Sequence, residues 1–140
     1  MTTLEEALEG STPLAQKVRA AGPYRSGAQL IAQMRAMLPT LTDEEKVATL
    51  NAHPRIGDDP QRLSTRSLKE QGAGQHPELA RLNDEYERRF GFRFVVFVNR
   101  RPKAEILGVL KSRMANPTDQ ELETALSELV SIAEDRWSSA

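Results

Sequence analysis

The sequence predicts an all-α protein, a single compact multi-helix domain over residues 1–140. Three observations support this. A Ser or Thr is followed three residues later by Glu or Gln at several places, among them Thr3, Ser26, Thr42 and Thr118, and this spacing lets the two side chains cap the free amides at a helix start. Apolar residues then recur at intervals of three or four, as on one face of a helix. The single strand-like run has no second segment to pair with, and a lone strand does not make a sheet.

The expected helices follow one another along the chain, joined by short turns that contain proline or glycine. The capping patterns place helix starts at Thr3, Ser26, Thr42 and Thr118. Behind the last three starts the apolar stripes are Leu30, Met34 and Met37 or Leu38; Val47 and Leu50; and Leu122, Leu126, Leu129, Ala133 and Trp137. Two further helices are predicted at 77–89 and 103–114. Such stripes are typical of core packing and say little about function.

Size, charge and cysteine content narrow the possible functions. Nineteen basic and twenty acidic residues give a formal net charge of -1, so no bulk field draws the chain to nucleic acid or to an acidic membrane. The absence of cysteine excludes disulfides and thiol chemistry. The longest strongly apolar run, Phe94 to Val98, is too short to cross a bilayer, and the first residues lack the pattern of a signal peptide. We therefore expect a cytoplasmic protein that binds neither membrane nor nucleic acid.

His53 is one of only two histidines and lies directly before a proline. The ring of Pro54 disfavours the α conformation in the preceding residue, so the helix that starts at Thr42 must end close to His53. The side chain of His53 then leaves the helical surface. This stretch alone leaves two interpretations open: a capped helix end with a solvated or locally bonded histidine, or a catalytic histidine.

A second polar cluster comprises Ser67, Glu70 and Gln71. On a helix, their three- and four-residue spacings place a hydroxyl, a carboxylate and an amide on one side, where they can bind one ligand. The alternative is an exposed helix face that ends at the glycines of Gly72-Ala73-Gly74. His76, in the turn before the next helix, is interpreted as structural.

The run Phe94 to Val98 is rich in aromatic and β-branched side chains, and its propensity is that of a buried strand. If it is extended inside a helical protein, its amides and carbonyls need other partners, because buried backbone groups are seldom left unpaired. A ligand with alternating N–H and C=O groups is one candidate partner. The alternative is an apolar helix start or a connection that fills the core.

Other site classes find little support. His53 and His76 lack the spacing of a helical metal pair, and we expect no metal. The chain has neither a Gly-rich phosphate loop nor a Gly-x-Ser-x-Gly elbow. Basic residues near the apolar run are diluted by acidic neighbours such as Glu85, Glu87 and Glu105, which argues against nucleic-acid binding.

Four motifs, taken in order, carry a resemblance to a known family. They are His53-Pro54-Arg55-Ile56-Gly57, Ser67-x-x-Glu70-Gln71, Leu82-Asn83-x-x-Tyr86 and Phe90-Gly91-Phe92-x-Phe94-Val95-Val96. Their order and spacing resemble those of the 2-oxo-4-hydroxy-4-carboxy-5-ureidoimidazoline (OHCU) decarboxylases of urate breakdown. The resemblance runs from about residue 10 to the C-terminus.

This resemblance implies an all-α, usually homodimeric enzyme that needs no cofactor and converts the ureidoimidazoline to (S)-allantoin. By matching position, His53 would be the acid-base residue, acting with Glu70, and a pKa near neutrality would suit its proton transfer. Pro54 would shape the pocket, and Ser67 and Gln71 would bind the substrate together with Glu70. The flat part of the substrate would lie against the last set of residues, which is Phe94, Val95, Val96, Phe97, Val98 and Asn99.

The chain departs from the family pattern at two positions beside this run. Many members have a proline where this chain has Arg93, and several have an arginine where it has Asn99. A neutral amide cannot replace a bidentate guanidinium, so Asn99 would contribute hydrogen bonds only, or Arg100 or Arg101 would supply the charge. Two alternatives to OHCU decarboxylation follow: a helical binding module without catalysis, and a decarboxylase of a related ureido acid.

Overall fold

The computed structural model describes residues 3–55 and 77–138, and these residues form helices and their connections without a strand. The prediction of an all-α fold is therefore confirmed. In chain order the elements are α1 (Leu4–Leu8), α2 (Pro13–Ala21), α3 (Gly27–Met37), the 3₁₀ turn η1 (Leu38–Thr40), α4 (Asp43–Asn51), α6 (Pro77–Phe90), α7 (Lys103–Arg113) and α8 (Thr118–Ser138).

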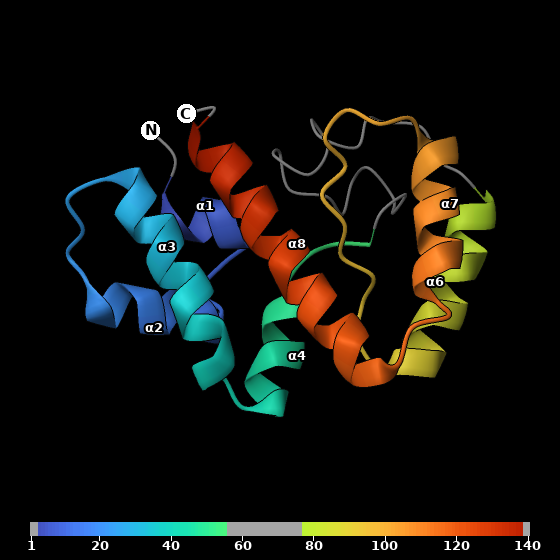
Figure 1. The fold of residues 1–140 in the computed structure, drawn as a ribbon, viewed down its shortest axis with the longest axis horizontal. Helices are drawn as coiled ribbons and strands as arrows, with labels where there is room; N and C mark the ends of the chain where they lie inside the picture. The colour runs from blue at the N-terminus through green and yellow to red at the C-terminus, as the bar shows by residue number, and fades with distance from the viewer. Residues whose placement is uncertain (1–2, 56–76, 139–140) are drawn as a thin grey trace.

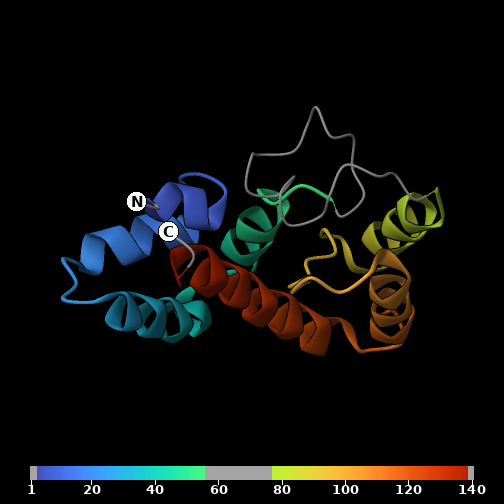
Figure 2. The same cartoon turned by 90° about the horizontal axis from the view of Figure 1, so that it is seen from above.

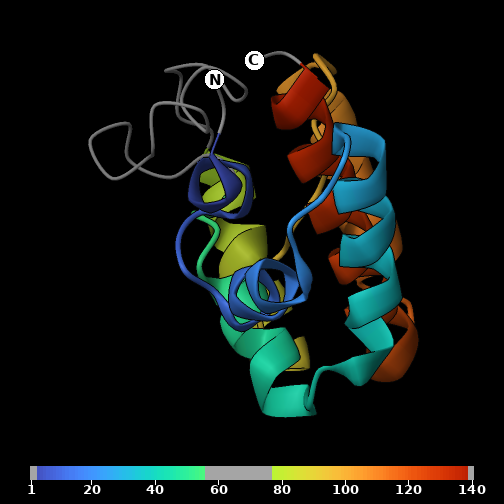
Figure 3. The ribbon, with the colours of Figure 1, turned by 90° about the vertical axis from the view of Figure 1, so that its left-hand side faces the viewer.

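Helix α8 is the longest element and passes through the middle of the molecule (Figure 1). It packs against α1, α3 and α4, and α2 packs against the same three helices. Helices α6 and α7 pack against each other at the opposite end, so the molecule is elongated when seen from above (Figure 2). Seen from the end that carries α1 to α3, α3 lies along α8 (Figure 3). The start of α8 therefore lies near α6 and α7, and its end lies near α1.

Three of the four predicted helix starts are capped as expected. The hydroxyls of Thr3, Ser26 and Thr42 each accept a hydrogen bond from the amide three residues on. At Thr42 the reciprocal arrangement known as a capping box is complete, because the Glu45 carboxylate also accepts a hydrogen bond from the Thr42 amide at 2.9 Å. These short-range contacts follow directly from the sequence pattern.

The interpretation of the fourth capping pattern was wrong, although the helix that it predicted is present. Thr118 is the first residue of α8 rather than its cap, and the Glu121 side chain turns into the core. Helix α2 was not predicted at all. Its start carries a capping threonine, Thr12, followed by Pro13 at the first helical position, and this pair was the signal that could have identified it.

The strand-like run is neither strand nor helix, so the strand that its propensity favours does not form and the run is part of a connection. It lies in the connection between α6 and α7, which passes beside α8 in Figure 1. Four rings from α6 and this connection form an aromatic cluster, with the Tyr86 ring centroid 4.6 Å from that of Phe90, 5.9 Å from that of Phe92 and 5.2 Å from that of Phe94. The apolar side chains thus fill the core without a sheet.

A buried ion pair ties this connection to α7 and α8. The Arg113 guanidinium, 8% exposed, lies 2.5 Å from the carboxylate of Glu121, which is fully buried. Glu121 also accepts a hydrogen bond from the Tyr86 hydroxyl at 2.5 Å and one from the side-chain Nδ2 of Asn116 at 3.0 Å. Arg113 in turn lies over the Phe94 ring, 4.6 Å from its centroid, and donates to the Val95 carbonyl at 2.8 Å. One guanidinium therefore joins two helices and the connection.

Glu121→Gln is expected to lower the free energy of unfolding by about 3 kcal/mol, because it leaves the Arg113 charge buried without its counter-charge. Urea denaturation measures the change. Glu123→Gln is the matched control, since Glu123 lies on the same helix but is exposed, and its effect should stay within about 0.5 kcal/mol. Equal urea midpoints for the two variants would contradict the importance of the buried pair.

Candidate active site

His53 follows the C-terminal end of α4 and is buried. Helix α4 ends at Asn51, Ala52 caps it, and the His53 amide donates to the Leu50 carbonyl at 3.1 Å. The predicted helix end before Pro54 is thus in place. The residue is only 4% exposed, and its Nε2 has no hydrogen-bond partner among the described residues. The interpretation of a solvated histidine does not fit this burial.

The environment of His53 favours the neutral ring. Burial is the main cause, the positive charge of Arg136 adds to it, and the negative charge of Glu9 opposes it; together they lower the pKa of His53 from 6.5 to about 4. The ring is therefore neutral at pH 7 in the ligand-free chain. The pKa near neutrality that the sequence analysis assumed applies to a solvated ring, and burial removes that solvation.

Arg136 and Glu9 form a second ion pair, between the last turn of α8 and the end of α1. Their charged groups are 2.8 Å apart, with side-chain exposures of 2% and 10%, and Arg136 also donates to the Glu6 carbonyl at 3.0 Å. The sequence analysis missed this pair. The available signal was a charged residue on the apolar stripe of α8, since Arg136 lies three residues after the buried Ala133.

Two arginines hold the backbone around His53. Arg93 Nη1 donates to the carbonyls of Asn51 and His53 at 2.9 and 3.0 Å, and the Arg93 amide donates to Asn51 Oδ1 at 3.0 Å. From the other side, Arg55 forms ion pairs with Asp84 at 2.7 Å and with Glu87 at 2.5 Å, both on α6. His53 and the half-buried Pro54 are therefore fixed between α6 and the start of the apolar run.

Side chains, not another strand, bind the backbone of the run. Phe94, Val95 and Val96 are buried, and Phe97 and Val98 are half-buried. The Val95 carbonyl accepts from Arg113, and the Phe97 amide donates to Glu128 on α8 at 3.4 Å. Arg101 donates to the carbonyls of Phe97 and Val98 at 2.5 and 3.1 Å. The guanidinium of Arg101 is thus engaged by the protein's own backbone.

Asn99 lies in a tight turn that closes the run. Asn99 and Arg100 both have positive φ angles, 48° and 61°, and the Arg101 amide donates to the Val98 carbonyl at 3.0 Å. Two central residues with positive φ and a hydrogen bond from the fourth residue to the first are the features of a type I′ turn, in which asparagine is favoured at the first central position. Asn99 is exposed, and its presence has this conformational explanation whatever its role in binding.

The structure brings together His53, Pro54 and the start of the 94–98 run through the contacts of Arg93. The predicted ligand-binding residues Ser67, Glu70 and Gln71, and His76 with them, lie outside the described residues. Within residues 3–55 and 77–138, no three His, Cys, Asp or Glu side chains lie grouped so that they could hold a metal ion. In the same part of the chain, no helix has the length and apolarity needed to cross a membrane.

Comparison with known proteins finds one family. The family model described as OHCU decarboxylase matches residues 1–138. A 2-oxo-4-hydroxy-4-carboxy-5-ureidoimidazoline decarboxylase from Haloferax volcanii is 28% identical over 138 residues, which cover 94% of this chain and 82% of the relative. A putative decarboxylase of the same name from Homo sapiens is 31% identical, with 90% and 79% covered. The crystal structure of an OHCU decarboxylase in the presence of (S)-allantoin has a TM-score of 0.77 at 28% identity, with 96% and 95% covered.

The buried state of His53 is expected to make stability fall between pH 7 and pH 5. In the unfolded chain the ring takes up a proton near its ordinary pKa of 6.5, whereas in the folded chain it does so only near 4, so lowering the pH favours the unfolded state. The resulting loss is about 2 kcal/mol at pH 5 relative to pH 7. It should be absent in His53→Gln and present in His76→Gln, as measured by urea denaturation at both pH values. The same pH dependence in both variants would contradict a buried, neutral His53.

The turn at Asn99 is expected to tolerate glycine better than alanine. Asn99→Gly keeps access to positive φ, whereas Asn99→Ala should lower the free energy of unfolding by about 1 kcal/mol, because alanine keeps the Cβ clash of that conformation but lacks the polar group with which asparagine offsets it. Urea denaturation of the two variants measures the difference. A more stable alanine variant would show that the left-handed turn is not the constraint at this position.

Proposed function

This chain is a member of the OHCU decarboxylase family, and we propose that it is a carboxy-lyase that converts 2-oxo-4-hydroxy-4-carboxy-5-ureidoimidazoline to (S)-allantoin in urate degradation. The observation that carries the proposal is the ring of His53, which is 4% exposed and has an Nε2 without a partner among the described residues. A buried polar atom without a partner costs free energy. A bound substrate that supplies the missing hydrogen-bond partner of Nε2 removes this cost.

The reaction breaks the bond between a ring carbon and its carboxylate. Carbon dioxide leaves, and the electron pair of the broken bond stays on the ring carbon, from which the adjacent conjugated imine accepts it. The substrate is therefore its own electron acceptor, and the reaction as proposed needs no cofactor. The protein must exclude water from the leaving carboxylate and deliver a proton to one face of the ring.

His53 suits the transfer of that proton. A neutral imidazole has one N–H and one lone pair, so it can accept a proton from an O–H or N–H group of the substrate and return it to carbon. The substrate is an anion, and a negative charge within about 4–6 Å favours the protonated ring, so binding raises the pKa of His53. Departure of neutral carbon dioxide leaves that negative charge on the substrate ring, delocalised into the imine. The proton of His53 then passes to carbon, which neutralises the substrate ring and returns the imidazole to its neutral form.

The remaining site roles follow the family motifs. The buried run Phe94, Val95 and Val96, with the half-buried Phe97 and Val98, offers an apolar surface and backbone groups to the flat ureidoimidazoline. Pro54 lies beside His53 and helps to shape the pocket. Ser67, Glu70 and Gln71 bind and orient the substrate, Asn99 contributes an amide at the end of the run, and the Glu70 carboxylate favours the loss of carbon dioxide by repelling the substrate carboxylate.

We also propose a homodimer, as the family resemblance implies, and a cytoplasmic location, because the relatives include proteins named for uric acid degradation. Light scattering on the purified chain tests the first: a mass of two chains supports a dimer, and a mass of one chain at assay concentration contradicts it.

His53→Ala is expected to abolish catalysed formation of optically active allantoin, because it removes the ring through which the proposed proton transfer passes. Fresh hydroxyisourate and its hydrolase generate the substrate, and optical rotation follows the product after the spontaneous decay is subtracted. Glu70→Gln should lower the rate at least about 10-fold, as expected for loss of a group that acts in the transition state. His76→Ala is the control, and circular dichroism must show that each variant stays helical.

Undiminished stereoselective turnover by His53→Ala would overturn the assignment of His53. If the wild-type chain leaves the decay at its spontaneous rate but binds (S)-allantoin in calorimetry, the chain is a binding module without catalysis. If it acts only on an analogue with a different ureido acid, the reaction class stands and the substrate is wrong.

A further inference from the structure

Arg93 performs an unusual task at the end of α4. The last carbonyls of a helix have no partner within the helix, and many helices solve this with a glycine that turns the chain back. Helix α4 cannot use that solution, because Ala52, His53 and Pro54 follow Asn51. Instead Nη1 of Arg93, which is 40 residues beyond His53, donates to the carbonyls of Asn51 and His53. A cation is also the favoured charge at this end of a helix.

Contacts with Asn51 and Glu87 hold Arg93 itself in position. Its amide is held by Asn51 Oδ1 at 3.0 Å, and its Nε lies 3.8 Å from Oε1 of Glu87. The other oxygen of Glu87 pairs with Arg55 at 2.5 Å. One carboxylate on α6 therefore contacts both arginines that flank His53. The guanidinium of Arg93 has little freedom to move without releasing the His53 backbone.

The rest of the apolar run has anchors of its own. Arg113 binds the Val95 carbonyl and Glu128 accepts from the Phe97 amide, and neither contact depends on Arg93. Loss of the Arg93 guanidinium therefore releases the His53 backbone but leaves residues 95–98 in place. This separation makes the role of Arg93 measurable.

We propose that Arg93 is a positioning residue that sets the orientation of the His53 ring by holding the His53 carbonyl. The inference rests on the proposed function, in which His53 transfers the proton. The guanidinium does not touch the substrate and acts only through His53. Misplacement of a reacting group by about 1 Å can cost about 100-fold in rate, so this contact is large enough to matter.

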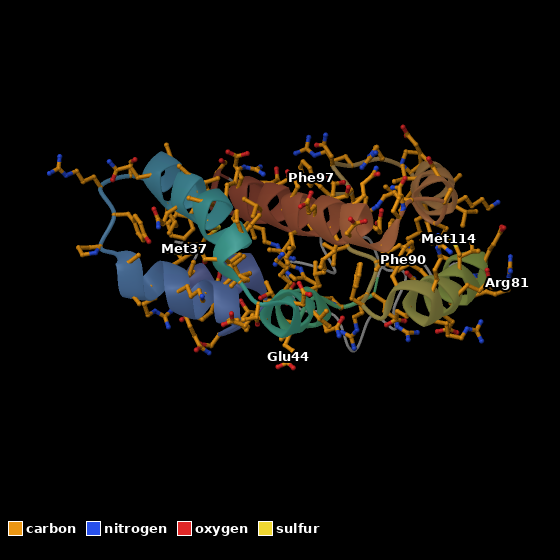
Figure 4. The ribbon with its side chains drawn as sticks, turned by 60° about the horizontal axis from the view of Figure 1, so that its bottom comes forward. Met37, Glu44, Arg81, Phe90, Phe97 and Met114 are labelled. Carbon is orange, nitrogen blue, oxygen red and sulfur yellow. The ribbon has the colours of Figure 1, made fainter. Side chains whose placement is uncertain are left out.

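The test compares Arg93→Met, Arg93→Lys and Arg81→Met. Methionine keeps most of the apolar stem and removes every donor. Lysine retains one nitrogen with several protons, and since both carbonyls are bound by the single Nη1 of Arg93, it can replace much of the contact. Arg81 is the matched control, because it is exposed on α6, its ion pairs within residues 3–55 and 77–138 are with Glu78 and Glu85 on the same helix, and it lies at the end far from α4 (Figure 4).

For Arg93→Met we expect kcat for allantoin formation to fall about 10- to 100-fold, with KM within about threefold of wild type. Arg93→Lys should recover at least half of the lost activity on a logarithmic scale, and Arg81→Met should behave as wild type. Assays run well below the melting temperature of each variant. A KM that rises while kcat is kept, or a kcat within twofold of wild type, would overturn the proposal.

A second readout is independent of turnover. The chain has two histidines, so in a His76→Asn background one imidazole gives the ring signals in a proton NMR spectrum. At pH 7 Arg93→Met should shift or broaden the His53 Hε1 signal, and Arg81→Met should not. If the wild-type chain proves inactive, the proposed function fails and this signal alone decides: a changed signal supports positioning by Arg93, and an unchanged signal overturns it.

Discussion

The structure depends on one constraint: a non-helical, apolar stretch runs through the core of a helical protein, and its backbone must find hydrogen bonds without a neighbouring strand. Arginine side chains bind three carbonyls of this stretch. Arg113 binds the Val95 carbonyl, and Arg101 binds those of Phe97 and Val98. A guanidinium has a long stem and several donors, so it can reach an isolated carbonyl that no backbone amide approaches. Each of these bonds also buries or half-buries a charge, which fixes where the counter-charges must lie.

Arginine side chains also fix the chain around His53. Arg93 and Arg55 hold the chain on both sides of it, and the imidazole is buried with an Nε2 that has no hydrogen-bond partner among the described residues. Burial makes the ring neutral, and a neutral ring in a dry site can both accept and donate a proton. Site geometry and ring chemistry thus have a common origin in the contacts of Arg55 with α6 and of Arg93 with the end of α4.

Local features were predictable from the sequence, and distant pairs were not. The caps at Thr3, Ser26 and Thr42 involve atoms three residues apart, and Pro54 acts on its immediate neighbour, so short patterns identified them. The hydrogen-bond partners of the apolar run could not be predicted from the sequence, because Arg113 and Glu128 lie on other helices. Glu121 was misread for the same reason: its spacing to Thr118 fits a cap, but its partners Tyr86 and Arg113 are brought close only by the fold. The roles of Ser67, Glu70 and Gln71 still rest on the family motif.

The central claim is that packing holds His53 buried and neutral, ready for proton transfer. The most direct measurement is an NMR titration of its ring between pH 8 and pH 5 in the ligand-free chain, with His76 replaced by asparagine to leave one imidazole. The account predicts that the Hε1 and Hδ2 shifts of His53 stay nearly constant over this range, since the pKa lies near 4. A full titration with a midpoint near 6.5, the ordinary pKa of histidine, would contradict it, because such a ring would be solvated.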